Sequence, residues 1–132
     1  MQQPGQTVII KKRASFADTM RHIERIAAEG AKHPKIKAIS RRIASEPDPV
    51  RAAFDFAYNA AVYVPDPIDF QDIRYPQRTI RDGIGNCVDY SVLISSILRN
   101  VGIPHRFRVA AYHHGFRSIS DLRLDKALAC EH

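Results

Sequence analysis

The sequence predicts an α+β domain in which helices come first, followed by a central helix headed by Cys87 and then a small antiparallel sheet on which that helix packs. Three observations predict this class. Apolar residues recur at helical spacing over most of residues 15–62, the strongest helical pattern begins at Cys87, and the alternation typical of a strand begins only at His105. Helices followed by strands, instead of alternating with them, are the pattern of an α+β fold.

The first 14 residues are interpreted as an N-terminal arm, in which residues 7–10 form either a short strand or an extended segment. Residues 15–132 are interpreted as a single domain that begins with a helical part, residues 15–62. Three helices are expected there, because each apolar run follows a pattern typical of a helix start: Ser15, His33-Pro34 and Pro47-Asp48-Pro49.

The rest of the domain is divided by its prolines and glycines into four segments. These are a surface loop over 68–76, the central helix over 87–99, a strand region over 105–119 and a C-terminal helix over 120–130. The loop is expected because Pro65 and Pro67 force an extended path. The central helix is expected to end before Gly102, a residue type that often follows the last helical turn.

Composition and charge exclude several classes of protein. The 132 residues are enough for one domain whose core needs no disulfide. No apolar run approaches the ~18 residues that cross a bilayer, and the first residues do not form a signal peptide. We therefore expect a protein that is cytoplasmic or associated with a particle, neither secreted by a signal peptide nor bound to a membrane. The net charge of +6 is spread along the chain without a binding motif, so specific recognition of nucleic acid is not expected.

The chain contains two cysteines, Cys87 and Cys130. Neither has a partner at C-x-x-C spacing, so no metal site is indicated and no cofactor is expected. A thiol at the start of a helix lies at the positive end of the helix dipole, which favours the nucleophilic thiolate. The N–H groups of the first turn can also bind the oxyanion that forms on attack at a carbonyl. Placement alone leaves two interpretations of Cys87 open: a nucleophile, or a small apolar residue packed against the first helix.

The residues that surround the first cysteine resemble a known family. The stretch GNCVDYS (85–91) is followed by an apolar helix, by GIP (102–104) and by RFRV (106–109). This order resembles the transglutaminase-like superfamily, whose members have a papain-like cysteine fold. Upstream pieces such as YVPDP (63–67) are similar to the version found in phages and prophages. The resemblance covers residues 23–112.

By that resemblance Cys87 is the nucleophile of the family. It would attack an amide or ester carbonyl of a peptide or protein substrate and form a thioester, which water resolves in hydrolysis and an amine resolves in transfer. Tyr63 lies where an upstream residue would lend a second oxyanion donor. The alternative for Tyr63 is a tyrosine that fills the core at a helix end.

The expected proton acceptor is where the sequence departs from the family. A histidine begins the strand after the first core strand in the family, whereas the equivalent residues 115–119 contain none. His113 and His114, at the end of the preceding strand, are the candidate bases, and an exposed turn is their alternative role. Asp121 is the candidate orienting acid, and the N-cap of the last helix is its alternative role.

The family core continues with further strands, whereas only a helix is expected after Ser118. The domain is therefore expected to be truncated at its C-terminus. An unfinished sheet would leave an open edge, and such an edge invites oligomerisation or pairing with another chain.

These observations leave two main functions. The first is cysteine-dependent amide hydrolysis or acyl transfer on a peptide or protein, which the cysteine helix favours. The second is a catalytically incomplete module of the same fold, a structural or assembly part of a phage particle in contact with neighbouring structural proteins. The missing histidine and the short C-terminus favour this second function. A third hypothesis, a basic protein associated with nucleic acid, predicts steeply salt-dependent binding.

Overall fold

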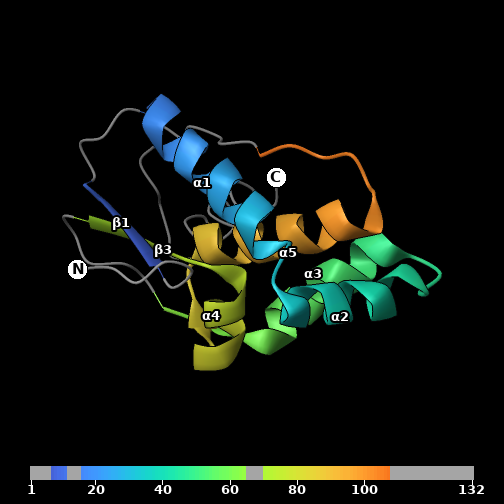
Figure 1. Cartoon of the computed structure of the whole chain (residues 1–132). Coiled ribbons are helices and arrows are strands. Elements are labelled where there is room, and N and C mark those ends of the chain that lie inside the picture. Colours follow the sequence, from blue (N-terminus) through green and yellow to red (C-terminus); the bar gives the residue numbers. More distant parts are fainter. Residues whose placement is uncertain (1–6, 12–15, 65–69, 108–132) are drawn as a thin grey trace, which may run out of the picture.

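The computed structural model describes residues 7–11, 16–64 and 70–107 of the chain (Figure 1). Within these ranges the chain forms five helices and four short strands. In chain order they are β1 (Thr7–Lys11), α1 (Phe16–Gly30), α2 (Pro34–Ala44), α3 (Pro49–Ala60), β2 (Val62–Tyr63), β3 (Phe70–Arg74), α4 (Pro76–Asp82), β4 (Ile84–Gly85) and α5 (Cys87–Val101).

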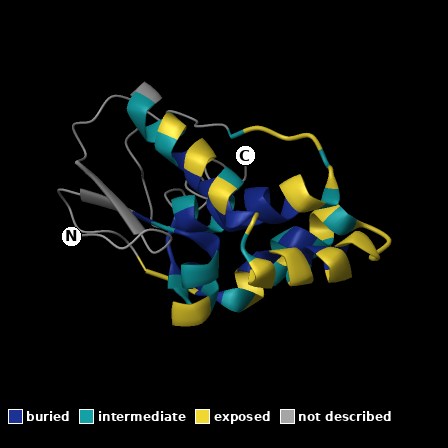
Figure 2. Cartoon of the chain, viewed as in Figure 1, coloured by how far each residue is buried: buried dark blue, intermediate teal, exposed yellow. Residues whose placement is uncertain are grey.

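Helix α5 lies at the centre of the fold. Helices α1, α2, α3 and α4 all contact it, and every residue from Val92 to Leu98 is buried. A helix that is buried on all sides is surrounded by other elements instead of presenting a solvent face. Figure 2 shows this difference, because α5 is largely buried while the outer faces of α1 and α2 are exposed.

Two apolar clusters form the core on either side of α5. One joins α2 and α3 to the middle and end of α5 and includes Ile36, Ala53, Leu93 and Ile97. The other joins α1 and β3 to the first half of α5 and includes Ile26, Ile73, Tyr75 and Val92. Each large aliphatic side chain in these clusters contributes about 1.5–3 kcal/mol through burial. Packing of α5 against both clusters fixes the position of its first turn.

Proline begins three of the helices, at Pro34 of α2, Pro49 of α3 and Pro76 of α4. Its fixed φ suits the first helical position, where the missing N–H would have no partner within the helix. The side chains of His33 and Asp48 cap α2 and α3 by accepting hydrogen bonds from N–H groups of the first turn. The expected starts of the second and third helices are therefore confirmed.

The four strands form two separate pairs. Strands β1 and β3 are antiparallel, with Thr7 opposite Arg74 and Lys11 opposite Phe70. Strands β2 and β4 are parallel, with Tyr63 opposite Gly85. Because β4 ends two residues before α5 begins, this second pair brings the end of α3 and the segment after it to the start of α5.

The expected loop over 68–76 is wrong for most of its length. Residues Phe70–Arg74 form β3, and α4 begins at Pro76. The prolines upstream do not prevent a strand from starting after them, and Ile73 is completely buried against α1 and α5. The pairing of β3 with β1 also decides between the two alternatives for residues 7–10, which form a strand.

The described part of the chain is a mostly helical α+β fold with a small sheet. All strands that the described ranges contain precede α5, and their antiparallel pair is made by β1 and β3. The expected central helix is confirmed from Cys87 and extends to Val101. Residues 103–107 are neither helix nor strand. The remaining part of the expected strand region and the expected helix 120–130 lie outside the described residues.

Across the described ranges, none of the helices combines the length and the apolar character needed to span a lipid bilayer.

Candidate active site

Cys87 is the first residue of α5, and its side chain is half-buried. The residue before it, Asn86, is extended and caps the helix. Oδ1 of Asn86 accepts a hydrogen bond from the N–H of Asp89 at 3.0 Å, and Oδ2 of Asp89 accepts one from the N–H of Asn86 at 3.0 Å. This reciprocal capping box fixes the backbone on both sides of Cys87. The box uses the N–H groups of Asn86 and Asp89, and the N–H groups of a first helical turn are not used by the hydrogen bonds of the helix backbone itself.

Asp89 also joins the start of α5 to β3. Its side chain is completely buried, and it accepts hydrogen bonds from the backbone N–H of Arg74 at 2.7 Å and from Nη1 of Arg74 at 2.9 Å. Burial raises the pKa of Asp89 from 3.8 to about 6, because the lost solvation outweighs the hydrogen bonds and the Arg74 charge, which lower it. An acid–guanidinium pair is thus held in the interior two residues after the cysteine.

Gly85 allows this close packing just before the cysteine. A Cβ at Gly85 would lie 3.0 Å from Cβ of Asp89 and 3.3 Å from Cγ2 of Thr79. A larger residue would therefore push β4 away from α4 and α5. The glycine before Cys87 thus has a packing role inside the fold.

The segment after α3 lies beside the start of α5. Tyr63 pairs with Gly85 in the parallel register, and the N–H of Val64 donates to the carbonyl oxygen of Gly85 at 2.8 Å. Tyr63 is 45% exposed, so it does not fill the core. The structure therefore excludes the core role for this tyrosine and leaves its role as an oxyanion donor a prediction.

Aromatic contacts hold the end of α3 on the first turn of α5. The hydroxyl of Tyr90 donates to the carbonyl oxygen of Ala61 at 2.7 Å, and the ring of Tyr90 stacks on that of Tyr58 with centroids 5.7 Å apart. Beyond this contact the chain exposes an apolar strip, which consists of Tyr58, Val62, Tyr63 and Val64. Val62 and Tyr63 of the strip form β2, which pairs with β4, while Tyr58 belongs to α3 and Val64 follows β2.

A mostly apolar cavity of about 220 Å³ lies beside α5, between Ser91 and Leu98. Ser91, one turn after Cys87, lines it and donates a hydrogen bond to the carbonyl oxygen of Cys87 at 3.0 Å. The other walls come from α3, later turns of α5 and residues 103–107. The start of α5 therefore combines a half-buried thiol, first-turn N–H groups and nearby apolar space.

A family model described as the transglutaminase-like superfamily matches residues 36–122, which include the whole of α5 and its capping residues. The chain belongs to the transglutaminase-like superfamily. The resemblance noted in the sequence is thus confirmed at the level of the superfamily, and the match does not assign a phage or prophage type. No curated protein and no solved structure gave a match.

The remaining candidates of this transglutaminase-like domain are His113, His114 and Asp121. They fall within the matched range but outside the described residues, and so does the expected turn that carries the two histidines. Their roles as bases and as orienting acid remain predictions. Cys130 also lies outside the described residues.

Among the described histidines, His105 makes a defined side-chain pair. Its Nε2 lies 2.6 Å from Oγ of Ser95, and its Nδ1 lies 2.9 Å from the carbonyl oxygen of Ile103. The carbonyl can only accept, so Nδ1 carries the proton and Nε2 accepts from the serine hydroxyl. Ser95 follows Cys87 by eight residues, about 12 Å along the helix axis. His105 therefore supports the far part of α5 and does not pair with the thiol.

Sequence reasoning missed the network around Asp89. Asn86 and Asp89 are three residues apart immediately before an apolar run, which is the spacing of a capping box, so this part could have been found. The contact of Asp89 with Arg74 has no such signal, because it depends on how β3 packs. No cluster of three metal-ligating side chains occurs within the part of the chain that the structure describes.

Proposed function

We propose that the protein is a cysteine-dependent acyl-transfer enzyme that acts on an amide of a peptide or protein. The observation that carries this proposal is the placement of Cys87 as the first residue of α5, half-buried and fixed by the capping box of Asn86 and Asp89. A cysteine with only a packing role does not need a fixed backbone at the start of a helix. A nucleophile needs it, because the thiolate and the oxyanion must both lie near the first turn.

The reaction begins when the Cys87 sulfur, as thiolate, attacks the amide carbonyl carbon. The carbonyl π electrons move onto oxygen, and N–H groups at the start of α5 stabilise this oxyanion, with Tyr63 as a second donor. The tetrahedral intermediate then re-forms the carbonyl and expels the amine, which takes a proton from the base. Water or a second amine attacks the thioester, gives up its proton, and releases the thiolate.

The base in this proposal is His113 or His114, with Asp121 as the residue that orients it. A base with a pKa near neutrality can take the proton from the thiol and return it to the leaving amine. The support is the position of these residues within the range that matches the superfamily.

The test is the rate of Cys87 alkylation by iodoacetamide as a function of pH, in a Cys130→Ser background. We expect an apparent thiol pKa below the ~8.5 of a free cysteine, and a return toward that value when His113 and His114 are both replaced by Ala. Alkylation that occurs only after unfolding would contradict the proposal. In the same background, Cys87→Ser should abolish turnover of a fluorogenic amide or ester.

A second candidate function is a non-catalytic module that assembles with neighbouring proteins of a phage virion. The exposed apolar strip of Tyr58, Val62, Tyr63 and Val64 favours it, since contiguous exposed apolar residues mark interaction sites. Under this alternative, Tyr63→Ser and Val64→Ser weaken assembly with the partner, while Cys87→Ser does not. An open sheet edge and oligomerisation belong to the same alternative.

A further inference from the structure

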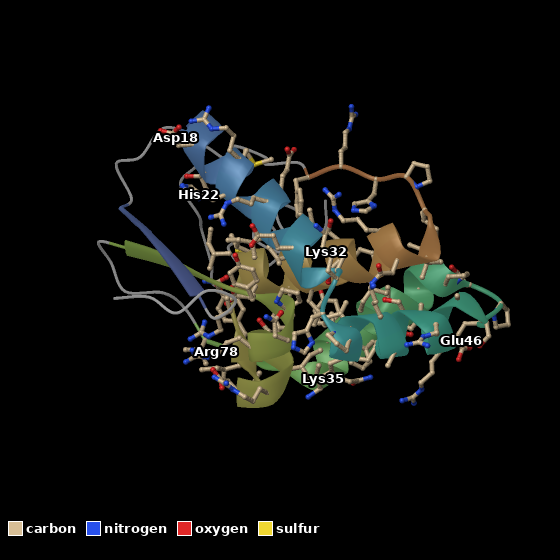
Figure 3. The ribbon with its side chains drawn as sticks, in the orientation of Figure 1. Asp18, His22, Lys32, Lys35, Glu46 and Arg78 are labelled. Carbon is tan, nitrogen blue, oxygen red and sulfur yellow. The ribbon has the colours of Figure 1, made fainter. Side chains whose placement is uncertain are left out.

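The outer face of α2 carries an unusual distribution of charge. Between Glu29 and Glu46 the chain contains no acidic residue, and five exposed cations occupy this stretch. They are Lys32, two residues before α2, and Lys35, Lys37, Arg41 and Arg42 on the helix; we call these five the α2 basic face. Figure 3 shows Lys35 near the beginning of α2 and Glu46 beyond its far end.

These five cations differ in their ion pairing from most arginines elsewhere in the described ranges. Six arginines pair with carboxylates elsewhere: Arg21, Arg25, Arg51, Arg74, Arg78 and Arg81. None of the residues of the α2 basic face forms an ion pair within the parts of the chain that the structure describes. Of the nearby carboxylates, Asp48 caps α3 and Asp55 pairs with Arg51, while Glu46 lies in the groove that Arg42 lines. Lys35, Lys37 and Arg41 therefore keep their positive charge without an ion pair to a described residue.

The helix holds this charge in a fixed arrangement. Ile36, Ser40 and Ile43 are buried on the opposite side, so the basic residues are held outward. Lys35 and Arg42 are seven residues apart, which is about 10 Å along the axis. The first turn of α2 contains no acidic residue, although acids are the residues that usually stabilise a helix N-terminus. The two lysines near this end thus increase a positive potential that already exists there.

The chemistry of the face selects one class of partner. None of the large hydrophobic residues exposed in the described ranges lies on α2, whereas the centre of a protein–protein interface is depleted in charge and enriched in large apolar side chains. The groove that Arg42 lines also carries the carboxylates of Glu46 and Asp55, and none of the five residues of the face is aromatic. A face that offers exposed cations matches a chain of phosphates.

We propose that the α2 basic face binds the phosphodiester backbone of nucleic acid without regard to sequence. Lysine and arginine at this surface neutralise phosphates and release the counterions that surround them. The absence of base-reading side chains agrees with the lack of a sequence-specific motif. Arg42 lines a groove with Glu46 and Asp55. Lys37 and Arg41, four residues apart on the same side of α2, therefore make the main contacts, and Lys35 adds a contact from the other flank of the exposed surface.

The test compares two triple variants in which the net charge falls equally. Lys35→Gln with Lys37→Gln and Arg41→Gln changes the α2 basic face. Arg21→Gln with Arg51→Gln and Arg81→Gln removes three exposed cations elsewhere. Glutamine keeps helix propensity close to that of lysine and arginine. Thermal unfolding by circular dichroism verifies that both variants fold.

Binding of a short fluorescein-labelled DNA duplex is measured by anisotropy between about 50 and 200 mM salt. We expect log K of the unmodified protein to fall with log salt with a slope of about −3, from about 0.9 for each of the three phosphate contacts. The variant of the α2 basic face should lose at least about tenfold in affinity at low salt and most of the salt dependence. The control variant should lose less than about threefold in affinity.

Three results would overturn the proposal. An equal loss of affinity for the duplex in both variants would mean that binding depends on net charge alone. Undetectable binding to the duplex at low salt would remove nucleic acid as the partner. Tighter binding of a polyglutamate peptide than of the duplex would identify an acidic protein segment instead. The alkylation of Cys87 is independent of all three results, so failure here leaves the proposed enzyme function untouched.

Discussion

At the scale of single residues, the position of Cys87 depends on its neighbours in the chain. Asn86 and Asp89 exchange hydrogen bonds across the first turn of α5, and Asp89 accepts two more from Arg74 of β3. The backbone on both sides of the cysteine is therefore held by this network. Reactivity of the thiol should follow the integrity of this network.

Replacement of Asn86 by Ala tests this dependence. Loss of an N-cap side chain costs about 1 kcal/mol of stability, and it should also slow native-state alkylation of Cys87 because the first turn loses its fixed geometry. Asp48→Ala is the matched control, since Oδ1 of Asp48 caps α3 by accepting from the N–H of Arg51 at 3.1 Å. Urea unfolding and iodoacetamide alkylation of both variants are the measurements.

The expected result is a similar loss of stability in both variants, with slower alkylation only in Asn86→Ala. Equal changes in alkylation would show that general loosening of the fold controls the thiol. No change in either variant would show that the capping box does not position Cys87.

At the scale of elements, α1 and α4 meet at an unusually close contact. Gly30, the last residue of α1, faces the ring of Pro76, the first residue of α4. A Cβ at Gly30 would lie 2.2 Å from Cγ and 2.4 Å from Cδ of Pro76. This contact positions α4, and α4 leads directly through β4 to Cys87.

Gly30→Ala should therefore destabilise the protein. Alanine would otherwise favour a helix by about 1 kcal/mol, so a loss of about 1–3 kcal/mol from overpacking would reveal the contact. The same substitution in a Pro76→Ala background should cost much less, because the ring is then absent. Free energies of unfolding for the four proteins form a double-mutant cycle, and additivity of the two substitutions would argue against the contact.

Elements differed in how well the sequence predicted them. Helix α5 was predicted from its first residue because local signals agree there: an apolar pattern starts at Cys87 and Gly102 ends it. The Gly102 φ of 85° suits a residue without Cβ. Strand β3 was missed because it is held by tertiary contacts, with Ile73 buried between α1 and α5. Helix α4 was also missed, although Pro76 at its first position is a helix-start signal.

Some residues of the candidate site were also predicted from the sequence, and others were not. Cys87 and the superfamily were found from a linear motif, since the residues that carry them are contiguous in the chain. Tyr63 was placed near the cysteine by resemblance, and the structure adds the parallel pairing with Gly85 as the physical link. The pair of Arg74 and Asp89 could not be predicted, because only the packing of β3 on α5 brings the two side chains together.

At the scale of the whole molecule, α5 is the element that all four other helices contact, and Asp89 is its buried charged group. Folding must remove this carboxylate from water, and the raised pKa of about 6 records that cost. The free energy of unfolding should therefore depend on pH through Asp89 in the range between its two pKa values. The sign of this dependence follows from the proton balance between the folded and unfolded states.

Between pH 4 and 6 the folded state holds a proton on Asp89 that the unfolded state, with a pKa near 3.8, has released. The folded state binds more protons in this window, so the contribution of Asp89 to the free energy of unfolding falls as pH rises. The fall is at most about 3 kcal/mol, from about 1.4 kcal/mol for each pKa unit. Asp89→Asn should remove it, which urea unfolding at pH 4, 5, 6 and 7 would measure.

Asp82 supplies the control, because its pKa is shifted in the opposite direction. Hydrogen bonds from Arg78 lower the pKa of Asp82, so its contribution is present above pH 4 and is lost as pH falls. Asp82→Asn should therefore leave the decline between pH 4 and 6 unchanged, while Asp89→Asn flattens it. An identical pH profile for Asp89→Asn and the unmodified protein would mean that Asp89 keeps its charge throughout. The ion pair with Arg74 would then lower the pKa of Asp89 by more than burial raises it, and a permanently charged carboxylate would cap the start of α5.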